Sequence, residues 1–389
     1  MHVRTHRLPL FLAILVMMVS AFATSVSAQD SKRLLSYYPY WAKWNAPSYT
    51  ARQIPYDKMT HILHAFLALK ANGQGGIVVP DGLIEDELIA RAHAAGVKVM
   101  NSVGGADPVQ AAAFSTIAAN PEYRRAFAHN MHEFMLRYGY DGVDIDWEVP
   151  NAPQDTVPCI MMMQALREEL PTSRWLVSMA IGSDPRGYGT GFDVPALAPL
   201  LDFINVMTYD FHGPWTDHAG HNSPLFLNHA DPGLEGSVET SIDLFTQLFG
   251  VSPQKLNIGT AFYGYEFGTV QRLWGFCNCG TTTLSVNYGT YIKQRINRQG
   301  WTRFVDLDAR APYLLYQGAG GDPGFITYDD AGSTARKVSY ALVSRDLGGA
   351  FMWDLSADYD GYSQDLLNSM YNAWLSASRG GGPLISQDH

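Results

Sequence analysis

A run of acidic residues near the middle of the chain has the types and spacing needed for acid catalysis. The segment Tyr140–Glu148 reads YDGVDIDWE. In a β-strand, successive side chains point to opposite faces, so Asp144, Asp146 and Glu148 would share one face and the apolar residues between them the other. This pattern predicts three carboxylates on one side of a strand whose other side is apolar.

Three carboxylates pointing into a protein interior cannot all ionise easily. Burial and mutual repulsion oppose the charges, so at least one carboxyl group should keep its proton near neutral pH. A protonated carboxyl beside an ionised one suits cleavage of a glycosidic bond, because the leaving oxygen must be protonated as the bond breaks. Glu148 ends the strand and is therefore the natural acid, with Asp146 and Asp144 behind it.

Two other interpretations of the acidic run compete with acid catalysis. A calcium loop is excluded, because the sixth position counted from Asp144 is Val149, where the turn of such a loop requires glycine. An exposed edge strand with acids on its wet face remains possible from this motif alone.

The rest of the chain alternates between strand-like and helix-like segments. Short β-rich apolar runs predict eight strands at about 34–41, 60–69, 97–104, 140–148, 175–181, 200–210, 255–263 and 347–355. Helical patterns lie between them, for example at 85–95, 121–138, 159–170, 237–249 and 334–345. This alternation predicts an α/β fold, a (β/α)8 TIM barrel, although a doubly wound open sheet would alternate in the same way.

One connection is too long for a simple barrel loop. About seventy residues separate the seventh strand from its helix, against usual loop lengths of a few residues. Segments 288–298 and 301–306 indicate mixed helix and strand there. We predict a barrel over 29–264 and 326–377, a small α+β insertion domain over 265–325, and a disordered glycine-rich tail over 378–389.

The N-terminus reads as a signal peptide of 28 residues. Arg4 and Arg7 precede an apolar stretch at 8–19, and Ala28 ends a small-residue cleavage pattern. No comparable apolar run recurs. We therefore expect a secreted protein, extracellular or periplasmic, without a membrane anchor.

Charge and cysteine content limit the partners further. The formal net charge is −10, which disfavours nucleic acid and anionic membranes and is compatible with a neutral polymer. The three cysteines, Cys159, Cys277 and Cys279, cannot all pair within one chain. Cys277 and Cys279 lack further metal ligands at suitable spacing, so an incidental loop or a local disulfide is expected, and neither a metal nor a cofactor.

At this point the chain resembles glycoside hydrolase family 18. The family signature D-x-x-D-x-D-x-E is met by Asp141, Asp144, Asp146 and Glu148. Further motifs match in order: Ser102-Val103-Gly104-Gly105 on the third strand, Met207-Thr208-Tyr209-Asp210 on the sixth, and Trp353 at the end of the eighth. The similarity spans about residues 34 to 375, and the insertion resembles the chitinase insertion domain.

The resemblance implies a substrate-assisted retaining mechanism, in which the acetamido oxygen of the substrate is the nucleophile. It implies that Glu148 is the acid, that Asp146, supported by Asp144, orients the acetamide, and that Tyr209 and Asp210 complete the catalytic group. The residues that the resemblance implies for sugar binding are Tyr37, Phe66, Gly104, Gly105, Trp215, Met207, Tyr263 and Trp353.

Two positions depart from the family pattern. Ala106 follows the S-x-G-G motif where many members have tryptophan, which removes an aromatic platform near the first leaving-group sugar. Tyr265 stands where an arginine is common, so a polar contact is expected to be lost or replaced by stacking.

The implied function is hydrolysis of β-1,4-linked N-acetylglucosamine polymers. The expected partners are chitin or chito-oligosaccharides, without nucleic acid or membrane, and the expected state is a monomer. Two alternatives are hydrolysis of other N-acetylglucosamine-containing glycans and a chitin-binding lectin. Lectins of the family typically lose the catalytic glutamate, whereas Glu148 is present.

Overall fold

The structure is a computed structural model that describes Met1 and residues 32–187, 190–318 and 323–382. Apart from Met1, the predicted signal peptide lies outside these residues. Within the described ranges, no helix combines the length and hydrophobicity needed to cross a bilayer.

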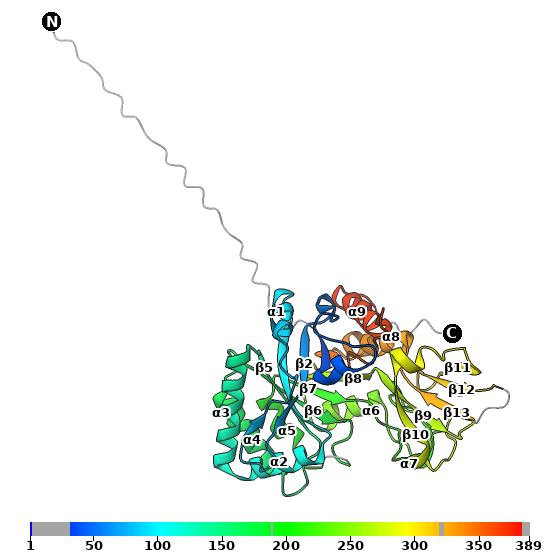
Figure 1. Cartoon of the computed structure of the whole chain (residues 1–389), viewed down its shortest axis with the longest axis horizontal. Coiled ribbons are helices and arrows are strands. Elements are labelled where there is room, and N and C mark those ends of the chain that lie inside the picture. The colour runs from blue at the N-terminus through cyan, green and yellow to red at the C-terminus, as the bar shows by residue number, and fades with distance from the viewer. Residues whose placement is uncertain (2–31, 188–189, 319–322, 383–389) are drawn as a thin grey trace. The chain divides into compact units, whose positions relative to one another are not determined.

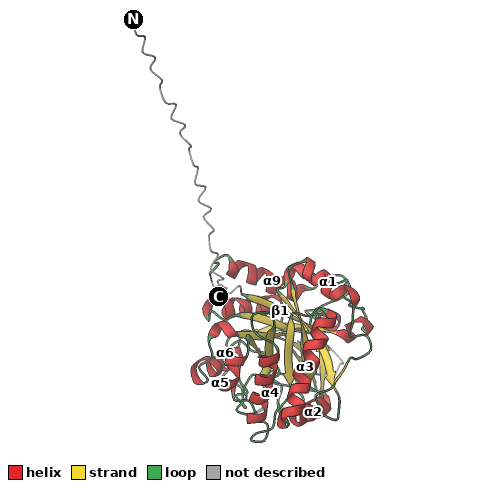
Figure 2. Cartoon of the chain, turned by 90° about the vertical axis from the view of Figure 1, so that its left-hand side faces the viewer, coloured by secondary structure: helices red, strands yellow, loops and turns green. Residues whose placement is uncertain are grey.

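Eight parallel strands close into a barrel (Figures 1 and 2). They are β1 (Arg33–Pro39), β2 (His61–Leu69), β4 (Lys98–Gly105), β5 (Gly142–Trp147), β6 (Leu176–Gly182), β7 (Phe203–Met207), β8 (Leu256–Ala261) and β14 (Gly349–Trp353). Each overlaps a predicted strand. β1 pairs with both β14 and β2, which closes the sheet and confirms the predicted barrel over the open alternative. The short β3 (Ile77–Val78) pairs antiparallel with β2.

Helices surround the barrel (Figure 2). They are α1 (Asp86–Ala94), α2 (Pro108–Ala119), α3 (Pro121–Tyr138), α4 (Thr156–Glu169), α5 (Val194–Leu197), α6 (Val238–Asp243), α8 (Ala331–Ser339) and α9 (Asp365–Ser378). α6 and α8 continue into wider helical turns over Leu244–Leu248 and Tyr340–Ser344. α2, α5 and α9 are not among the helical segments named from the sequence. The sequence of α2 is apolar almost all round and lacks a helical period.

Side-chain caps explain where several helices begin. The Asn120 side chain accepts hydrogen bonds from the first backbone N–H groups of α3, which starts with Pro121 and ends before Gly139 in the left-handed region (φ 82°). Ser237 and Asp330 cap α6 and α8 in the same way. α9 extends through Ser378, so the predicted tail begins within its last turn, and residues 383–389 lie outside the described part.

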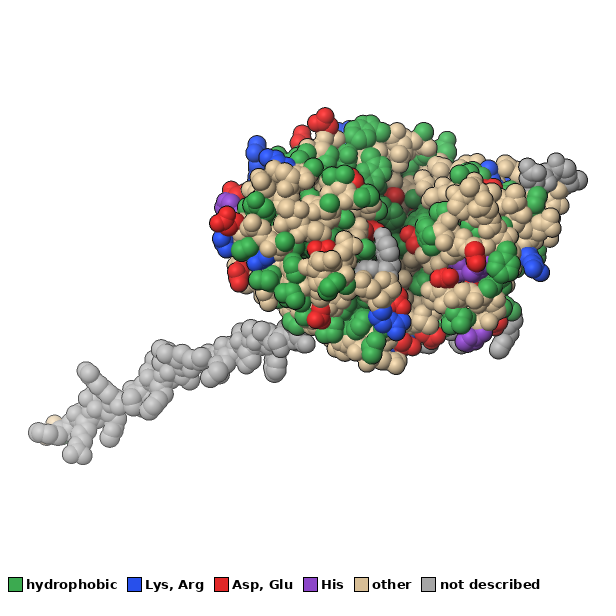
Figure 3. All heavy atoms as spheres, turned by 90° about the horizontal axis from the view of Figure 1, so that it is seen from below, with side chains coloured by type: hydrophobic (Ala, Val, Ile, Leu, Met, Phe, Trp, Pro, Cys, Tyr) green, Lys and Arg blue, Asp and Glu red, His purple; other side chains and the backbone are tan. Residues whose placement is uncertain are grey.

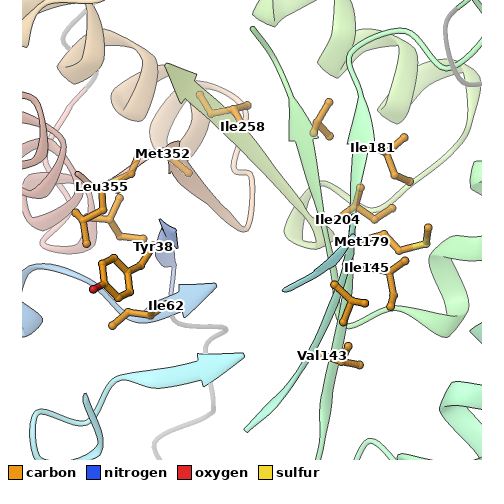
Figure 4. Packing of buried hydrophobic residues seen from close by; sticks show 14 of the residues in the cluster. Tyr38, Ile62, Val143, Ile145, Met179, Ile181, Ile204, Ile258, Met352 and Leu355 are labelled. Carbon is orange, nitrogen blue, oxygen red and sulfur yellow. The ribbon is translucent and has the colours of Figure 1, made fainter. Parts of the chain in front are cut away.

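Two apolar clusters hold the barrel together. The larger lies between the strands and the helices, where Val143, Ile145, Met179 and Ile204 project from neighbouring strands (Figure 4). The smaller includes Phe203 in the barrel interior and extends beyond the barrel to Phe267 and Phe325. Burial of both faces explains why the strands read as nearly continuous apolar runs.

A five-stranded antiparallel sheet interrupts the chain between β8 and α8 and lies beside the barrel (Figure 1). Its strands are β9 (Tyr263–Gly268), β10 (Thr283–Asn287), β11 (Trp301–Asp306), β12 (Ala311–Tyr316) and β13 (Gly324–Thr327), in the order β10-β9-β13-β12-β11. The helical turn α7 (Cys279–Thr282) precedes β10. The segment predicted as an insertion, 265–325, falls inside this sheet. Cys277 and Cys279 form a local disulfide, and Cys159 is buried and free.

Candidate active site

The acids of β5 point into the barrel. Asp144 is fully buried, Asp146 is 4% exposed, and Glu148 lies half-buried just beyond the last residue of the strand. The apolar residues between them face the helices, and Trp147 stacks on Phe114 of α2 with ring centroids 5.3 Å apart. β5 pairs with β4 on one side and β6 on the other, which excludes the edge-strand interpretation.

The first acid of the motif lies at the opposite end of the strand. The Asp141 carboxylate accepts hydrogen bonds from the backbone N–H of Val99 at 2.8 Å and from Lys98 at 3.0 Å, and it pairs with His93 at 2.8 Å. Burial would raise the pKa of Asp141, but these contacts outweigh it and lower the pKa. Asp141 therefore links the start of β5 to β4 and lies away from the cleft.

Asp144 lies at the centre of a buried polar network. Its carboxylate accepts hydrogen bonds from Tyr37 Oη at 2.9 Å, Ser102 Oγ at 2.8 Å, Ser178 Oγ at 2.6 Å and Asn205 Nδ2 at 3.4 Å. Burial raises the pKa of Asp144, and these donors oppose the shift. The donors come from β1, β4, β6 and β7, so the closed barrel assembles this network.

Asp146 and Glu148 form a coupled pair above Asp144. Burial, followed by the charges of Glu148 and Asp144, raises the pKa of Asp146 well above its usual range. Burial and the charge of Asp210 raise the pKa of Glu148 to about 7, while a hydrogen bond from Asp146 opposes that rise. The pair therefore holds a proton at neutral pH, as the sequence predicted for this row of acids.

Two glycines at the end of β4 allow the strand to pass close to this pair. Gly104 (φ 111°) and Gly105 (φ 89°) both adopt left-handed backbone conformations. A Cβ at Gly104 would lie 2.2 Å from the backbone oxygen of Asp146, and one at Gly105 would lie 2.7 Å from the Phe66 ring. Both positions therefore exclude any side chain.

Aromatic rings form the floor of the cleft. Phe66 stacks on Trp353 with centroids 5.6 Å apart, and Tyr37 meets Trp353 edge-on at 5.5 Å. Trp41 extends this surface, 6.0 Å from Phe66. Together with Glu148 they line a cavity of about 380 Å³. The surface seen from below is hollowed near its middle, where hydrophobic and acidic side chains gather (Figure 3).

The hydroxyl of Tyr209 is available to a ligand. Tyr209 follows β7, is 8% exposed and lines the cavity, and its hydroxyl makes no hydrogen bond to any residue that the structure describes. Burial and the neighbouring carboxylates, Asp146 first among them, raise the pKa of Tyr209. The hydroxyl therefore stays protonated and can donate a hydrogen bond.

Asp210 is held at the rim of the cleft in a left-handed conformation (φ 61°). Its backbone N–H donates to Asn222 Oδ1 at 2.9 Å, and its Oδ1 accepts from the hydroxyls of Tyr263 at 2.5 Å and Tyr265 at 2.9 Å. Desolvation by the cleft walls raises the pKa of Asp210, and the two hydroxyls oppose that shift. These contacts hold Asp210 in the cavity lining that it shares with Glu148.

Tyr265 makes both a polar contact and a ring contact. A polar contact usual at this position was expected to be lost or replaced by stacking, and here the Tyr265 hydroxyl donates a hydrogen bond to Asp210. Its ring also meets that of Trp215 edge-on at 5.6 Å. Tyr265 therefore links the cleft residue Asp210 to Trp215.

The structure brings most of the sequence-predicted residues together. The cavity lining includes Tyr37, Phe66, Gly104, Gly105, Asp146, Glu148, Met207, Tyr209, Asp210, Tyr263 and Trp353. Asp144 lies behind this lining. Trp215 lies outside it and is 57% exposed, because its loop leaves the barrel toward the five-stranded sheet.

Sequence reasoning missed three lining residues, Trp41, Asp107 and Ala180. Trp41 follows the end of the first strand, and other lining residues also follow the ends of their strands. This position is the sequence feature that could have identified Trp41. Asp107 also caps α2 by accepting a hydrogen bond from the Val109 N–H, and a polar residue before a helix is ordinary. Ala180 carries no chemical signal.

The (β/α)8 barrel is closed, and a carboxyl pair at the carboxyl ends of its strands holds a proton. These features define a barrel enzyme that uses acid–base catalysis. Residues 33–358 match the sequence model of the glycosyl hydrolases family 18. The chain belongs to this family and is a glycoside hydrolase.

Similar proteins agree with this placement. Chitinase A1 of Niallia circulans is 28% identical, and the match covers 93% of this chain and 62% of that protein's length. The structure of Ostrinia furnacalis group IV chitinase in complex with allosamidin has a TM-score of 0.78 at 26% identity, covering 89% of this chain and 99% of that one. A family 18 N-acetylglucosaminidase from Paenibacillus barengoltzii has a TM-score of 0.76 at 26% identity, covering 88% and 99%.

Proposed function

We propose that this chain is a secreted chitinase that hydrolyses β-1,4-linked N-acetylglucosamine polymers or oligomers with retention at the anomeric carbon. The observation that carries the proposal is the Asp146–Glu148 pair, which holds a proton beside an aromatic floor and the free hydroxyl of Tyr209. The chitinases among its relatives support the substrate class. Its expected export rests on the N-terminal sequence alone.

Each group at the site has a role in this proposal. Glu148 protonates the leaving oxygen and then activates water, since its pKa of about 7 suits both steps. Asp146 orients the acetamide N–H, and Tyr209 donates to the acetamide oxygen, which attacks the anomeric carbon. Asp210 positions the sugar and the water, and Trp353 lies beneath the distorted ring.

Chito-oligosaccharides of defined length test the function directly. We expect the purified protein to cleave chains of N-acetylglucosamine and to leave cellulose oligomers intact, because glucose lacks the acetamide that Asp146 and Tyr209 would engage. Product sizes from mass spectrometry also separate a chitinase from an enzyme that releases single N-acetylglucosamine units, the activity named for the Paenibacillus barengoltzii neighbour. Binding without cleavage would instead favour the lectin.

The pH profile should reflect the proton on Glu148. The acid form is active, so kcat/KM is expected to fall about tenfold per pH unit above pH 7 as this carboxyl ionises. The charge of Asp210 contributes to the raised pKa of Glu148. Asp210→Asn removes this charge, so the fall in kcat/KM, the alkaline limb of the profile, should begin at a lower pH, whatever the effect of the substitution on the maximal rate. Initial rates in buffers of constant ionic strength measure both profiles. A limb unmoved by Asp210→Asn would contradict this account.

Ala106 leaves one part of the cleft without an aromatic surface. It lines the cavity beside Gly105 and Asp107. Ala106→Trp is expected to strengthen binding of leaving-group sugars several-fold through stacking, measured as a lower KM for longer oligosaccharides and a shifted cleavage pattern. Ala106→Leu is the control, because leucine adds apolar bulk without an aromatic ring. Unchanged affinity and cleavage pattern in Ala106→Trp would mean that this position does not border the sugar path.

A further inference from the structure

A second cluster of titratable side chains lies apart from the cleft, in the loop between β7 and α6. His212, His218 and Asp231 are buried, with side chains 1%, 2% and 3% exposed. The two Nε2 atoms are 3.1 Å apart. Asp231 places Oδ1 2.9 Å from His218 Nε2 and Oδ2 3.3 Å from His212 Nε2. The proposed mechanism uses none of these groups.

Outer hydrogen bonds decide which nitrogen of each ring faces inward. His212 Nδ1 lies 3.0 Å from the carbonyl oxygen of His221, and His218 Nδ1 lies 2.7 Å from Asp217 Oδ1. Both partners can only accept, so each Nδ1 carries a hydrogen and donates it. Two neutral rings would then point their Nε2 lone pairs at the Asp231 carboxylate, and a cation bound between them would relieve the repulsion.

The spacing fits a metal ion. Ligand atoms 2.0–2.1 Å from a tetrahedral zinc ion lie about 3.3–3.4 Å from one another. The observed separations are 3.3, 3.1 and 2.9 Å, so these atoms need to move apart by at most a few tenths of an ångström to hold the ion. Two imidazoles and one carboxylate form a ligand set that zinc accepts, whereas calcium and magnesium prefer oxygen ligands. A backbone or side-chain contact on the far nitrogen of each ring is also usual for metal-bound histidine.

The surroundings hold the three side chains in place. The Asp231 carboxylate accepts hydrogen bonds from the backbone N–H groups of Gly233 at 3.0 Å and Glu235 at 3.3 Å. A Cβ at Gly220 would lie 2.3 Å from the His212 ring, so the loop closes tightly around it. The ligands are therefore preorganised by contacts that do not involve one another.

We propose that His212, His218 and Asp231 bind one divalent transition-metal ion, Zn²⁺ by preference, as a structural site. This inference departs from the sequence-based expectation of no metal, and it does not depend on the proposed function. The ion would tie together the loop that carries Asp210, which lies two residues before His212. The same loop bonds to the chain preceding β10, through Ala219 N–H to the Gly275 oxygen at 2.8 Å and Cys277 N–H to the Asp217 oxygen at 2.9 Å.

Zinc binding by the tag-free mature protein tests the site. After treatment with a chelator, the protein is titrated with Zn²⁺ against a chromophoric competitor, and bound zinc is counted by mass spectrometry. We expect one zinc per chain and no competition from Mg²⁺ or Ca²⁺. Asp231→Asn and His218→Gln should each weaken zinc binding at least about 100-fold, because removing a ligand costs more than disturbing its support. His229→Gln, an exposed histidine of the same loop, is the matched control and should bind normally.

Co²⁺ provides a second measurement that needs no variant. Wild-type protein loaded with Co²⁺ should show the intense visible absorption of a tetrahedral complex.

Circular dichroism checks that each variant used in the zinc titration is folded. The competing explanation for the cluster is that protonated histidines pair with Asp231. Substoichiometric zinc, a Co²⁺ spectrum like that of the free ion, or unchanged affinity in Asp231→Asn would each overturn the proposal.

Discussion

Glu148→Gln is expected to lower the turnover of chito-oligosaccharides by about 10²–10⁴-fold while leaving their binding nearly unchanged. The amide keeps the size and shape of the side chain but cannot release a proton to the leaving oxygen. It also cannot take a proton from water in the second step. Because Glu148 lies half-buried at the end of β5 with a pKa of about 7, no other described carboxyl lies in an equivalent place to take over.

Two measurements separate lost chemistry from lost structure. Calorimetric titration with an oligosaccharide should give similar affinities for wild type and Glu148→Gln, and thermal unfolding should show a folded variant. Glu168→Gln makes the same chemical change at an exposed position on α4 and should retain full activity. A folded Glu148→Gln enzyme with normal turnover would remove Glu148 from the role of acid.

Asp146→Asn is expected to have the second large effect, because Asp146 would stabilise the charge that develops when the acetamide oxygen attacks. Its Oδ1 is buried and has no hydrogen-bond partner in the described part of the chain, so it can accept the acetamide N–H. Losing one preorganised contact to a developing charge typically costs about 10²–10³-fold in kcat. A thiazoline analogue of the cyclised sugar should lose more affinity than the substrate does, since it mimics the charged intermediate.

The stereochemistry of the first product decides between mechanisms. Attack by the acetamide oxygen inverts the anomeric carbon once and water inverts it again, so the β configuration is retained. Proton NMR during early hydrolysis should therefore show β product before mutarotation. An initial α product would contradict the proposal and require an inverting pair of carboxylates separated by a water molecule.

The sequence was sufficient to predict those features of the fold and site that depend on a short repeat of residue types. The two-residue repeat of a strand put Asp144, Asp146 and Glu148 on one face, and the structure has them there. The eight strands were also predictable, because each is buried on both faces and reads as an apolar run. Charge repulsion among close carboxylates required a retained proton, whatever the fold around them.

Only the tertiary structure decided which distant residues meet. The pairing of β1 with β14 joins the first and last strands of the barrel, and the donors to Asp144 come from four different strands. Tyr265 reaches Asp210 because β9 leaves the barrel directly after β8. His212, His218 and Asp231 lie in irregular loop without a repeating period, so their spacing carries no signal. Contacts of this kind depend on packing across the whole fold, which the local periodicity of the sequence does not encode.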